Sequence, residues 1–212
     1  MPTNPHHQQS FGTFEGISSA DQLRLYFQLT DFDRALIDKM RSATTKLGFA
    51  VQLSSVRFLG TFPTNLQQVP AEVIDYLAKQ LTIDGRALAG YTRKMPISQH
   101  MALIKRKYHY QAFTDPAVKA SLNDWLLERA RFTNETEKLL FDMLLKKCLD
   151  EKILLPGVTT FERFVNGVTE VAADLLDSQL VAVPSAEETD RLLNLLTAVG
   201  EPIYGPPLKW IS

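Results

Sequence analysis

The stretch that decides the fold is TDFDRALIDKMRSATTKLGFAVQLSSVRFLG, residues 30–60. Apolar residues recur in it at spacings of four and three, which is the period of an amphipathic α-helix. The residues of this stripe are Phe32, Leu36, Met40, Ala43 and Leu47. Thr30 is a suitable N-cap, and Gly48 can supply the left-handed residue that ends a helix. We therefore predict one helix that ends at Gly48 and a second that ends at Gly60.

Helical spacing also extends over the rest of the chain. It predicts further helices over residues 19–27, 70–81, 84–91, 98–110, 115–131, 133–148, 159–175 and 184–196. No segment shows the sustained alternation of polar and apolar residues that is typical of a strand. The predicted fold class is therefore all-α, a multi-helix array in which a basic helix-turn-helix-like unit precedes an acidic helical unit.

The composition is that of an ordinary globular protein. Of the 212 residues, 45% are hydrophobic and 22% are charged, which excludes a fibrous or wholly disordered chain. No apolar run approaches the roughly 20 residues that span a bilayer. The first residues show neither the basic start nor the apolar core of a secretory signal, and the single cysteine, Cys148, cannot form an internal disulfide. We therefore expect a soluble protein of a reducing compartment, most simply the cytoplasm.

The formal net charge of -1 conceals a strong asymmetry. Residues 1–114 carry 13 Lys and Arg against 8 Asp and Glu, whereas residues 115–212 carry 10 against 16. The first part contains two windows without an acidic residue, Lys39–Ala71 and Gly85–Thr114. A polyanion responds to the local field, because salt screens charges beyond about 10 Å. The asymmetry favours a first half that binds nucleic acid, with a solvated basic face as the alternative.

The step in charge near residues 113–116 also indicates a change of domain. We predict a flexible lead-in (1–19), a basic helical DNA-binding domain (20–114), an acidic helical domain (115–200) and an irregular tail (201–212). The lead-in and the tail both contain Pro and Gly and lack a helical period.

The strongest binding candidate is the predicted helix Ser98–Tyr110. Its narrow apolar stripe consists of Ile97, Met101, Ile104 and Tyr108. At about 100° per residue, the opposite face carries Ser98, Gln99, Ala102, Lys105, Arg106 and His109. Ala102 keeps the middle of that face low, so the helix can lie close to a duplex. Ser98 and Gln99 would then reach base edges, while the cations from Lys105 to Lys107 would contact phosphates.

The segment before this helix resembles the start of a helix-turn-helix. A short helix from Asp84 to Tyr91 precedes the turn Thr92–Pro96, which is longer than the usual three or four residues. A second candidate phosphate contact lies around Gly48. The predicted DNA-binding residues are Arg41, Thr44, Lys46, Arg57, Arg93, Lys94, Ser98, Gln99, His100, Lys105, Arg106, Lys107 and His109. The alternative is a basic amphipathic helix that faces only solvent.

The sequence offers no recognisable catalytic site. It contains neither a phosphate-binding G-x-x-x-x-G-K-[ST] loop nor an H-E-x-x-H metal motif, and it has no cysteine cluster. His100 and His109 fall on different faces of one predicted helix, so they cannot hold a metal together. Cys148 lies in an apolar stripe and is expected to be a core residue. We therefore expect no catalytic residue, metal or cofactor in this chain.

Two longer runs resemble a known family. TKLGFAVQL (residues 45–53) and VRFLG (56–60) are similar to the N-terminal region of transposases of the Tn-three family of replicative bacterial transposons. Further blocks follow in family order: VPAEV (69–73), AKQL (78–81), QH (99–100) and LLPGVTT (154–160). The resemblance runs from about Leu25 to near Ala198.

The resemblance implies a specific role. The N-terminal part of such transposases binds the terminal inverted repeats of the transposon, and their metal-dependent catalytic carboxylates lie in an RNase-H-like core far downstream. The expected partners are double-stranded DNA and the remainder of the transposase, in the bacterial cytoplasm near the nucleoid and away from membranes. Two rivals stay open. One is a helical module for transposase self-association, with a homodimer as its product, and the other is an enzyme without a familiar motif.

Overall fold

The structure, a computed structural model, describes residues 11–14, 20–92, 94–132, 136–182 and 186–198. Its elements in chain order are α2 (Ala20–Phe27), α3 (Asp31–Ile37), α4 (Ala43–Leu59), η1 (Leu66–Gln68), α5 (Ala71–Leu81), η2 (Gly85–Gly90), α6 (Lys94–Tyr108), β1 (Gln111–Ala112), α7 (Pro116–Phe132), α8 (Glu137–Asp150), β2 (Ile153–Leu154), α9 (Val158–Ala182) and α10 (Ala186–Ala198). The elements η1 and η2 are 3₁₀-helices. Apart from the two-residue strands β1 and β2, the regular secondary structure of the described residues is helical, which confirms the predicted all-α fold class.

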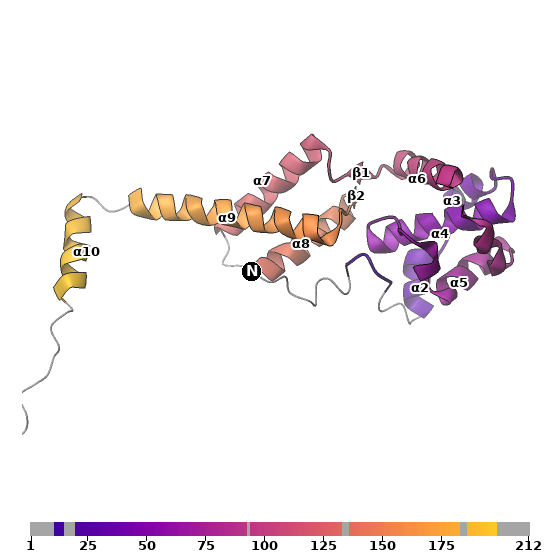
Figure 1. The fold of residues 1–212 in the computed structure, drawn as a ribbon, viewed down its shortest axis with the longest axis horizontal. Helices are drawn as coiled ribbons and strands as arrows, with labels where there is room; N and C mark the ends of the chain where they lie inside the picture. The colour runs from indigo at the N-terminus through magenta and orange to yellow at the C-terminus, as the bar shows by residue number, and fades with distance from the viewer. Residues whose placement is uncertain (1–10, 15–19, 93, 133–135, 183–185, 199–212) are drawn as a thin grey trace, which may run out of the picture.

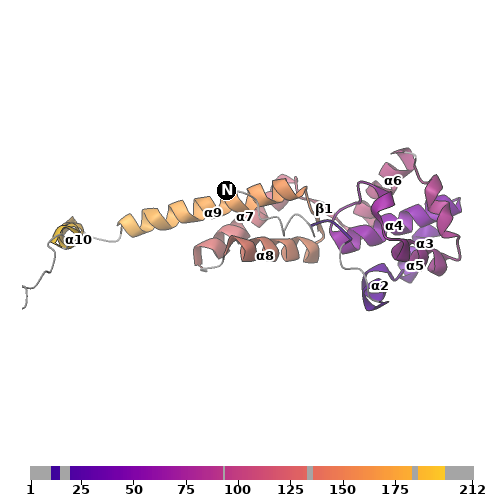
Figure 2. The same ribbon diagram turned by 60° about the horizontal axis from the view of Figure 1, so that its bottom comes forward.

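Helices α2 to α9 pack into two groups, each around its own core (Figure 1). Helices α2, α3, α5 and α6 surround α4, whose Leu47, Phe49 and Leu53 are completely buried. Helix α9 lies along α7 and α8, as Figure 2 shows, and Phe161 of α9 is completely buried in the second core. The chain passes from the first core to the second just before Phe113, where the charge balance changes sign.

A two-residue parallel ladder lies at the junction of the two groups. β1 pairs with β2, with Gln111 opposite Ile153. Beside the ladder, the carbonyl of Gly60 accepts a hydrogen bond from the amide of Leu155 at 2.9 Å. Gly60 is the left-handed C-cap of α4, with φ +71°, which confirms the prediction that a helix ends there. A Cβ at Gly60 would also lie 2.7 Å from the Leu155 side chain, so the close approach requires glycine as well.

The prediction that a helix ends at Gly48 is wrong. Helix α4 runs through Gly48, and the break in the chain lies earlier, between the end of α3 at Ile37 and the N-cap Ser42. Ser42 and Thr45 form a reciprocal capping box, which satisfies free amides of the first turn. Gly48 is instead required by packing, because a Cβ there would lie 2.5 Å from atoms of the Tyr91 ring.

The Gly48→Ala variant is expected to lower the free energy of unfolding by about 2 kcal/mol, because overpacking a core costs about 1–3 kcal/mol. Tyr91 cannot move aside freely, since it is only 5% exposed and its hydroxyl is hydrogen-bonded to His100. Gly167 is the matched control, because it lies inside α9 and a Cβ added there would meet no atom of the described residues within 4 Å. Gly167→Ala should instead be neutral or stabilising, and equal effects of the two variants in urea denaturation would contradict this packing role.

Most other predicted helices are present with shifted ends. Thr30 caps α3 through a capping box with Asp33, and Asp84 caps η2 by accepting from the amide of Arg86. Pro96 does not break the chain as expected, because it lies in the first turn of α6, where its missing amide donor costs little. The predicted start of a helix at Thr133 lies outside the described residues, and Thr136 is the N-cap of α8.

The predicted lead-in and tail fall largely outside the described residues. Within the lead-in, residues 11–14 contact both cores. Phe11 lies against Phe141 and Phe161, with ring centroids 5.8 and 5.5 Å apart, and Phe14 stacks on Phe58 at 6.1 Å. These contacts were not expected from the polar composition of the segment.

Candidate nucleic-acid interface

Helix α6 is held in the first core by one side and is open to solvent on the other. Ile104 is completely buried, and Leu103 and Tyr108 pack against the same core. The exposed residues of the helix include Ser98, Gln99, Ala102, Lys105, Arg106 and Lys107. The structure thus places the small Ala102 among exposed polar and basic side chains, as the helical period predicted. We call these six residues the α6 basic face.

The ends of α6 differ from the predicted ends. The helix begins at Lys94 and stops at Tyr108, and the next residue, His109, has a φ of +60°. Because α6 starts earlier than predicted, only three residues, 91–93, separate η2 from α6. Three residues is a usual length for the turn of a helix-turn-helix, although the preceding element is a 3₁₀-helix.

The cations of the α6 basic face are available to an external anion. Among the described residues, no carboxylate pairs with Lys105, Arg106 or Lys107. The Lys105 ammonium lies 5.8 Å from the centre of the Phe62 ring, a cation–π contact that orients its side chain without neutralising it. The segment Gly85–Thr114, which includes α6, contains no acidic residue. A phosphate backbone would therefore meet an uncompensated positive field on this face.

The second predicted patch, around Gly48, is only partly available. Arg41 and Thr44 lie at the start of α4, and Arg41 is exposed. Lys46 is bonded to the exposed carboxylate of Asp38 at 3.1 Å, a solvent-exposed pair that a phosphate could replace at small cost. Arg57 forms a buried ion pair with Asp33. Its guanidinium is therefore not available to bind a phosphate.

The buried ion pair of Arg57 fixes α3, α4 and α6 to one another. The Arg57 guanidinium donates two hydrogen bonds to the fully buried Asp33 carboxylate, at 2.9 and 2.6 Å. The Tyr108 hydroxyl of α6 donates a third to Asp33 at 2.5 Å, and the Thr30 amide a fourth at 2.8 Å. Burial alone would raise the pKa of Asp33, but hydrogen bonds from Arg57 and Tyr108 outweigh it and hold the pKa below its ordinary value. Asp33 therefore stays ionised and anchors the C-terminal end of α6.

His100 anchors the other part of α6. Its ring stacks on Tyr91 with centroids 5.5 Å apart, and its Nδ1 lies 2.6 Å from the Tyr91 hydroxyl. It also meets the Phe49 ring of α4 edge-on at 5.3 Å. Burial lowers the pKa of His100, so the ring is neutral at pH 7, and the tautomer decides whether Nδ1 accepts from the Tyr91 hydroxyl or donates to it. His100 thus faces the core, although it was predicted to contact DNA.

Three predicted residues complete the set. His109 is exposed directly after α6. Arg93 lies outside the described residues, as does the side chain of Lys94. The structure brings five of the 13 predicted residues together on the α6 basic face, separates Arg57 and His100 from it, and leaves the start of α4 as a second patch: the five are Ser98, Gln99, Lys105, Arg106 and Lys107.

Sequence reasoning missed two polar features of the first core. One is the Asp33 cluster. The other is Gln52 of α4, which is 2% exposed and whose Oε1 has no hydrogen-bond partner among the described residues. The only sequence signal for Gln52 is that one polar residue interrupts the apolar run from Phe49 to Leu53.

The second core contains the single cysteine of the sequence. Cys148 is completely buried, as predicted, and burial raises the pKa of its thiol to about 12. Within the part of the chain that the structure describes, no three His, Cys, Asp or Glu side chains are grouped so that they could hold a metal ion. In that same part, every helix is too short or too polar to cross a membrane.

Comparison with known proteins identifies the family. Residues 4–168 match the family described as "Domain of unknown function (DUF4158)". The transposase for transposon gamma-delta of Escherichia coli (strain K12) is 36% identical over 89% of this chain and 19% of its own length. The transposase for transposon Tn1546 of Enterococcus faecium is 28% identical over 83% of this chain and 18% of its own length. The chain thus spans about a fifth of the length of these relatives. It belongs to the DUF4158 family and corresponds to an N-terminal region of a Tn-three-family transposase.

Proposed function

We propose that this region binds double-stranded DNA at the terminal inverted repeats of a transposon, through the α6 basic face. One observation carries the proposal: Ile104 holds α6 in the core, and the opposite side of the helix is exposed. That side carries the small residue Ala102 and three cations, none of which has a carboxylate partner among the described residues. The relatives that match most of this chain are named as transposases, proteins that act on DNA.

The two ends of the α6 basic face would do different work. Lys105, Arg106 and Lys107 in the last turns would contact phosphates, which sets affinity and orientation but carries no sequence information. Ser98 and Gln99 lie nearer the N-terminus, and a glutamine carboxamide can pair with the edge of an adenine in the major groove. Arg41 at the start of α4 would supply a further phosphate contact, with Thr44 and Lys46 beside it.

The proposal assigns no chemistry to these residues. Strand cleavage and transfer would be carried out by the rest of the transposase, because this chain covers only about a fifth of its relatives. DNA and the remainder of the transposase would be its partners. Positioning of the transposon end is then the contribution of this region to transposition.

A second candidate function is a protein–protein contact through α9. This 25-residue helix leaves Val171 50% exposed and Leu175 37% exposed, on a chain half that is acidic overall. Exposed apolar side chains on an extended helix favour packing against another protein surface, such as the remainder of the transposase or a second copy. The two functions can coexist, since α9 and the α6 basic face belong to different groups of helices.

The proposal is tested by fluorescence-anisotropy titration of this chain with a terminal inverted repeat duplex and a scrambled duplex. We expect tighter binding to the repeat and a steep loss of affinity between 50 and 200 mM salt, because about six phosphate contacts would cost roughly a thousandfold. Equal, salt-sensitive binding to both duplexes would leave a nonspecific basic surface. No binding to either, with self-association that persists at high salt, would favour the protein–protein function.

A further inference from the structure

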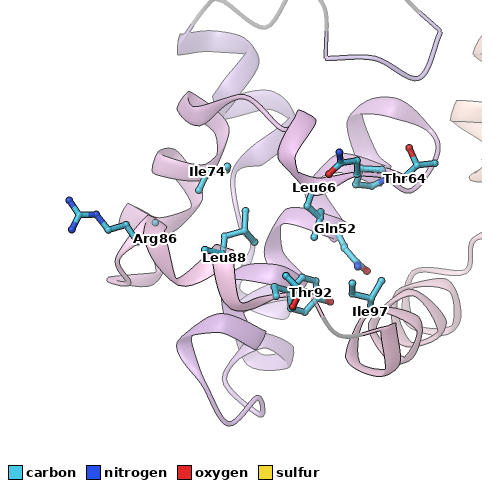
Figure 3. Close-up of a pocket in the computed structure, with 13 residues that line it drawn as sticks. Gln52, Thr64, Leu66, Ile74, Arg86, Leu88, Thr92 and Ile97 are labelled. Atoms are coloured by element: carbon cyan, nitrogen blue, oxygen red, sulfur yellow. The ribbon is translucent and has the colours of Figure 1, made fainter.

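A cavity of about 490 Å³ lies inside the first group of helices, next to the N-terminal part of α6. Its volume is within the range of about 300–1,000 Å³ that is typical of small-molecule sites. The walls come from α4, residues 63–65, the first residue of η1, α5, η2 and α6, and Figure 3 shows how side chains from these elements converge on it. Leu66, Ile74, Leu88 and Ile97 make much of the wall apolar.

Several polar side chains line this cavity, and among them Gln52 carries a buried acceptor without a partner in the described residues. Its side chain projects from α4 into the cavity (Figure 3), although the residue is only 2% exposed. Its Oε1 has no hydrogen-bond partner among the described residues. A buried acceptor without a partner costs about 1–3 kcal/mol, so a ligand whose donor meets this oxygen when the side chain turns toward it would recover up to that amount. A carboxamide also offers donors beside its acceptor, so the matching ligand is a flat group with a donor next to an acceptor.

The charge around the cavity indicates the kind of ligand. No acidic side chain is among the described residues that line it, and Arg86 is the charged one, exposed at the rim and pointing away from the interior (Figure 3). The wall residue Ile97 directly precedes Ser98 and Gln99 of the α6 basic face. The cavity therefore adjoins the surface on which we place DNA, and a cation at its rim suits a phosphate.

We propose that this cavity receives one unstacked nucleobase of the bound DNA, with the Gln52 carboxamide pairing with its edge and Arg86 meeting an adjacent phosphate. The inference rests on the proposed DNA-binding function and deepens it. The apolar walls replace the stacking that the base loses, and the glutamine replaces part of its pairing. Unstacking is least costly for a base that is already unpaired, so an unpaired base is the natural probe.

The test compares three duplexes that carry the same terminal inverted repeat: fully paired, with a single bulged adenine, and with a bulged abasic site. The abasic duplex controls for backbone flexibility, because it bends like the bulge but offers no base. For the unaltered chain, we expect the adenine bulge to bind about tenfold more tightly than the abasic bulge, the gain from satisfying one buried polar group. In Gln52→Leu the ratio should fall to about one, while affinity for the paired duplex stays unchanged.

Ser55→Ala is the matched control, since Ser55 is another buried polar residue of α4, its hydroxyl has no partner among the described residues, and it does not line the cavity. This variant should keep the tenfold ratio. Gln52→Leu should fold at least as stably as the parent, because it removes an unpaired buried acceptor. An equal affinity of the parent for the adenine and abasic bulges, or an unchanged ratio in Gln52→Leu, would overturn the cavity inference and leave DNA binding intact. Failure to bind any of the three duplexes would overturn both proposals.

Discussion

Reversing the charges of Lys105 and Arg106 together is expected to abolish detectable DNA binding at physiological salt. Both side chains are exposed, and among the described residues neither has a carboxylate partner that would hold it away from a phosphate. The double variant Lys105→Glu/Arg106→Glu removes two phosphate contacts and adds two repulsions. The measurement is an anisotropy titration over a salt series, with circular dichroism as the check that the variant is folded.

The variant Lys105→Gln/Arg106→Gln removes the two positive charges without adding negative ones, so it measures how much the two phosphate contacts contribute. It should still bind at low salt, with a slope of log affinity against log salt that is smaller by about 2, or roughly 0.9 for each lost phosphate contact. Lys119→Glu/Lys138→Glu is the matched control, because it makes the same change in net charge as the double reversal, at exposed positions of α7 and α8. If that control weakens binding as much as Lys105→Glu/Arg106→Glu, the effect belongs to net charge and the α6 basic face is not the interface.

The periodic features of this protein could be predicted from its sequence because they are local. The stripe of Ile97, Ile104 and Tyr108 lies on one side of α6 whatever the rest of the chain does, since a helix places residues three and four apart on one face. Caps are equally local, as at Thr30 and Gly60. The all-α fold class followed from the same periods.

Features that depend on distant residues could not be predicted. Arg57 looked like a free cation because its partner, Asp33, is 24 positions away and both are common surface residues. His100 looked like part of the binding face because the Tyr91 ring that covers it comes from a separate segment. Gly48 satisfied the local rule for a helix end, but its contact with Tyr91 is tertiary, and the capping box at Ser42 marks the actual boundary.

Among the variants proposed for this protein, removing the buried charge of Asp33 is expected to cause the largest loss of folding stability. The Asp33→Asn variant should lower the free energy of unfolding by about 3 kcal/mol, because removing one partner of a buried ion pair costs about 3–5 kcal/mol and Arg57 keeps a little solvent contact, at 24% exposure. The change also weakens the Thr30 capping box, in which Asp33 accepts from the Thr30 amide. Urea denaturation at pH 7 measures the effect.

Asp38→Asn is the matched control for this prediction. Asp38 directly follows α3 and pairs with a cation, Lys46, but its side chain is 72% exposed. Exposed pairs contribute about 0–1 kcal/mol, so this variant should change the free energy of unfolding little. Comparable losses in the two variants would show that the Asp33 cluster is not a buried anchor.

The pH dependence of stability separates the charge of Asp33 from its shape. Its pKa in the folded chain is below the ordinary value of 3.8, because hydrogen bonds from Arg57 and Tyr108 outweigh the effect of burial. The ionised carboxylate therefore contributes its full stabilisation above pH 3.8 and loses it as the pH falls through the folded pKa. The parent chain should lose stability over that range, whereas Asp33→Asn should lose less, so that the two curves converge at low pH. Parallel curves would mean that Asp33 acts through packing alone, and α6 would then owe its position to Ile104 and His100 rather than to an ionic anchor.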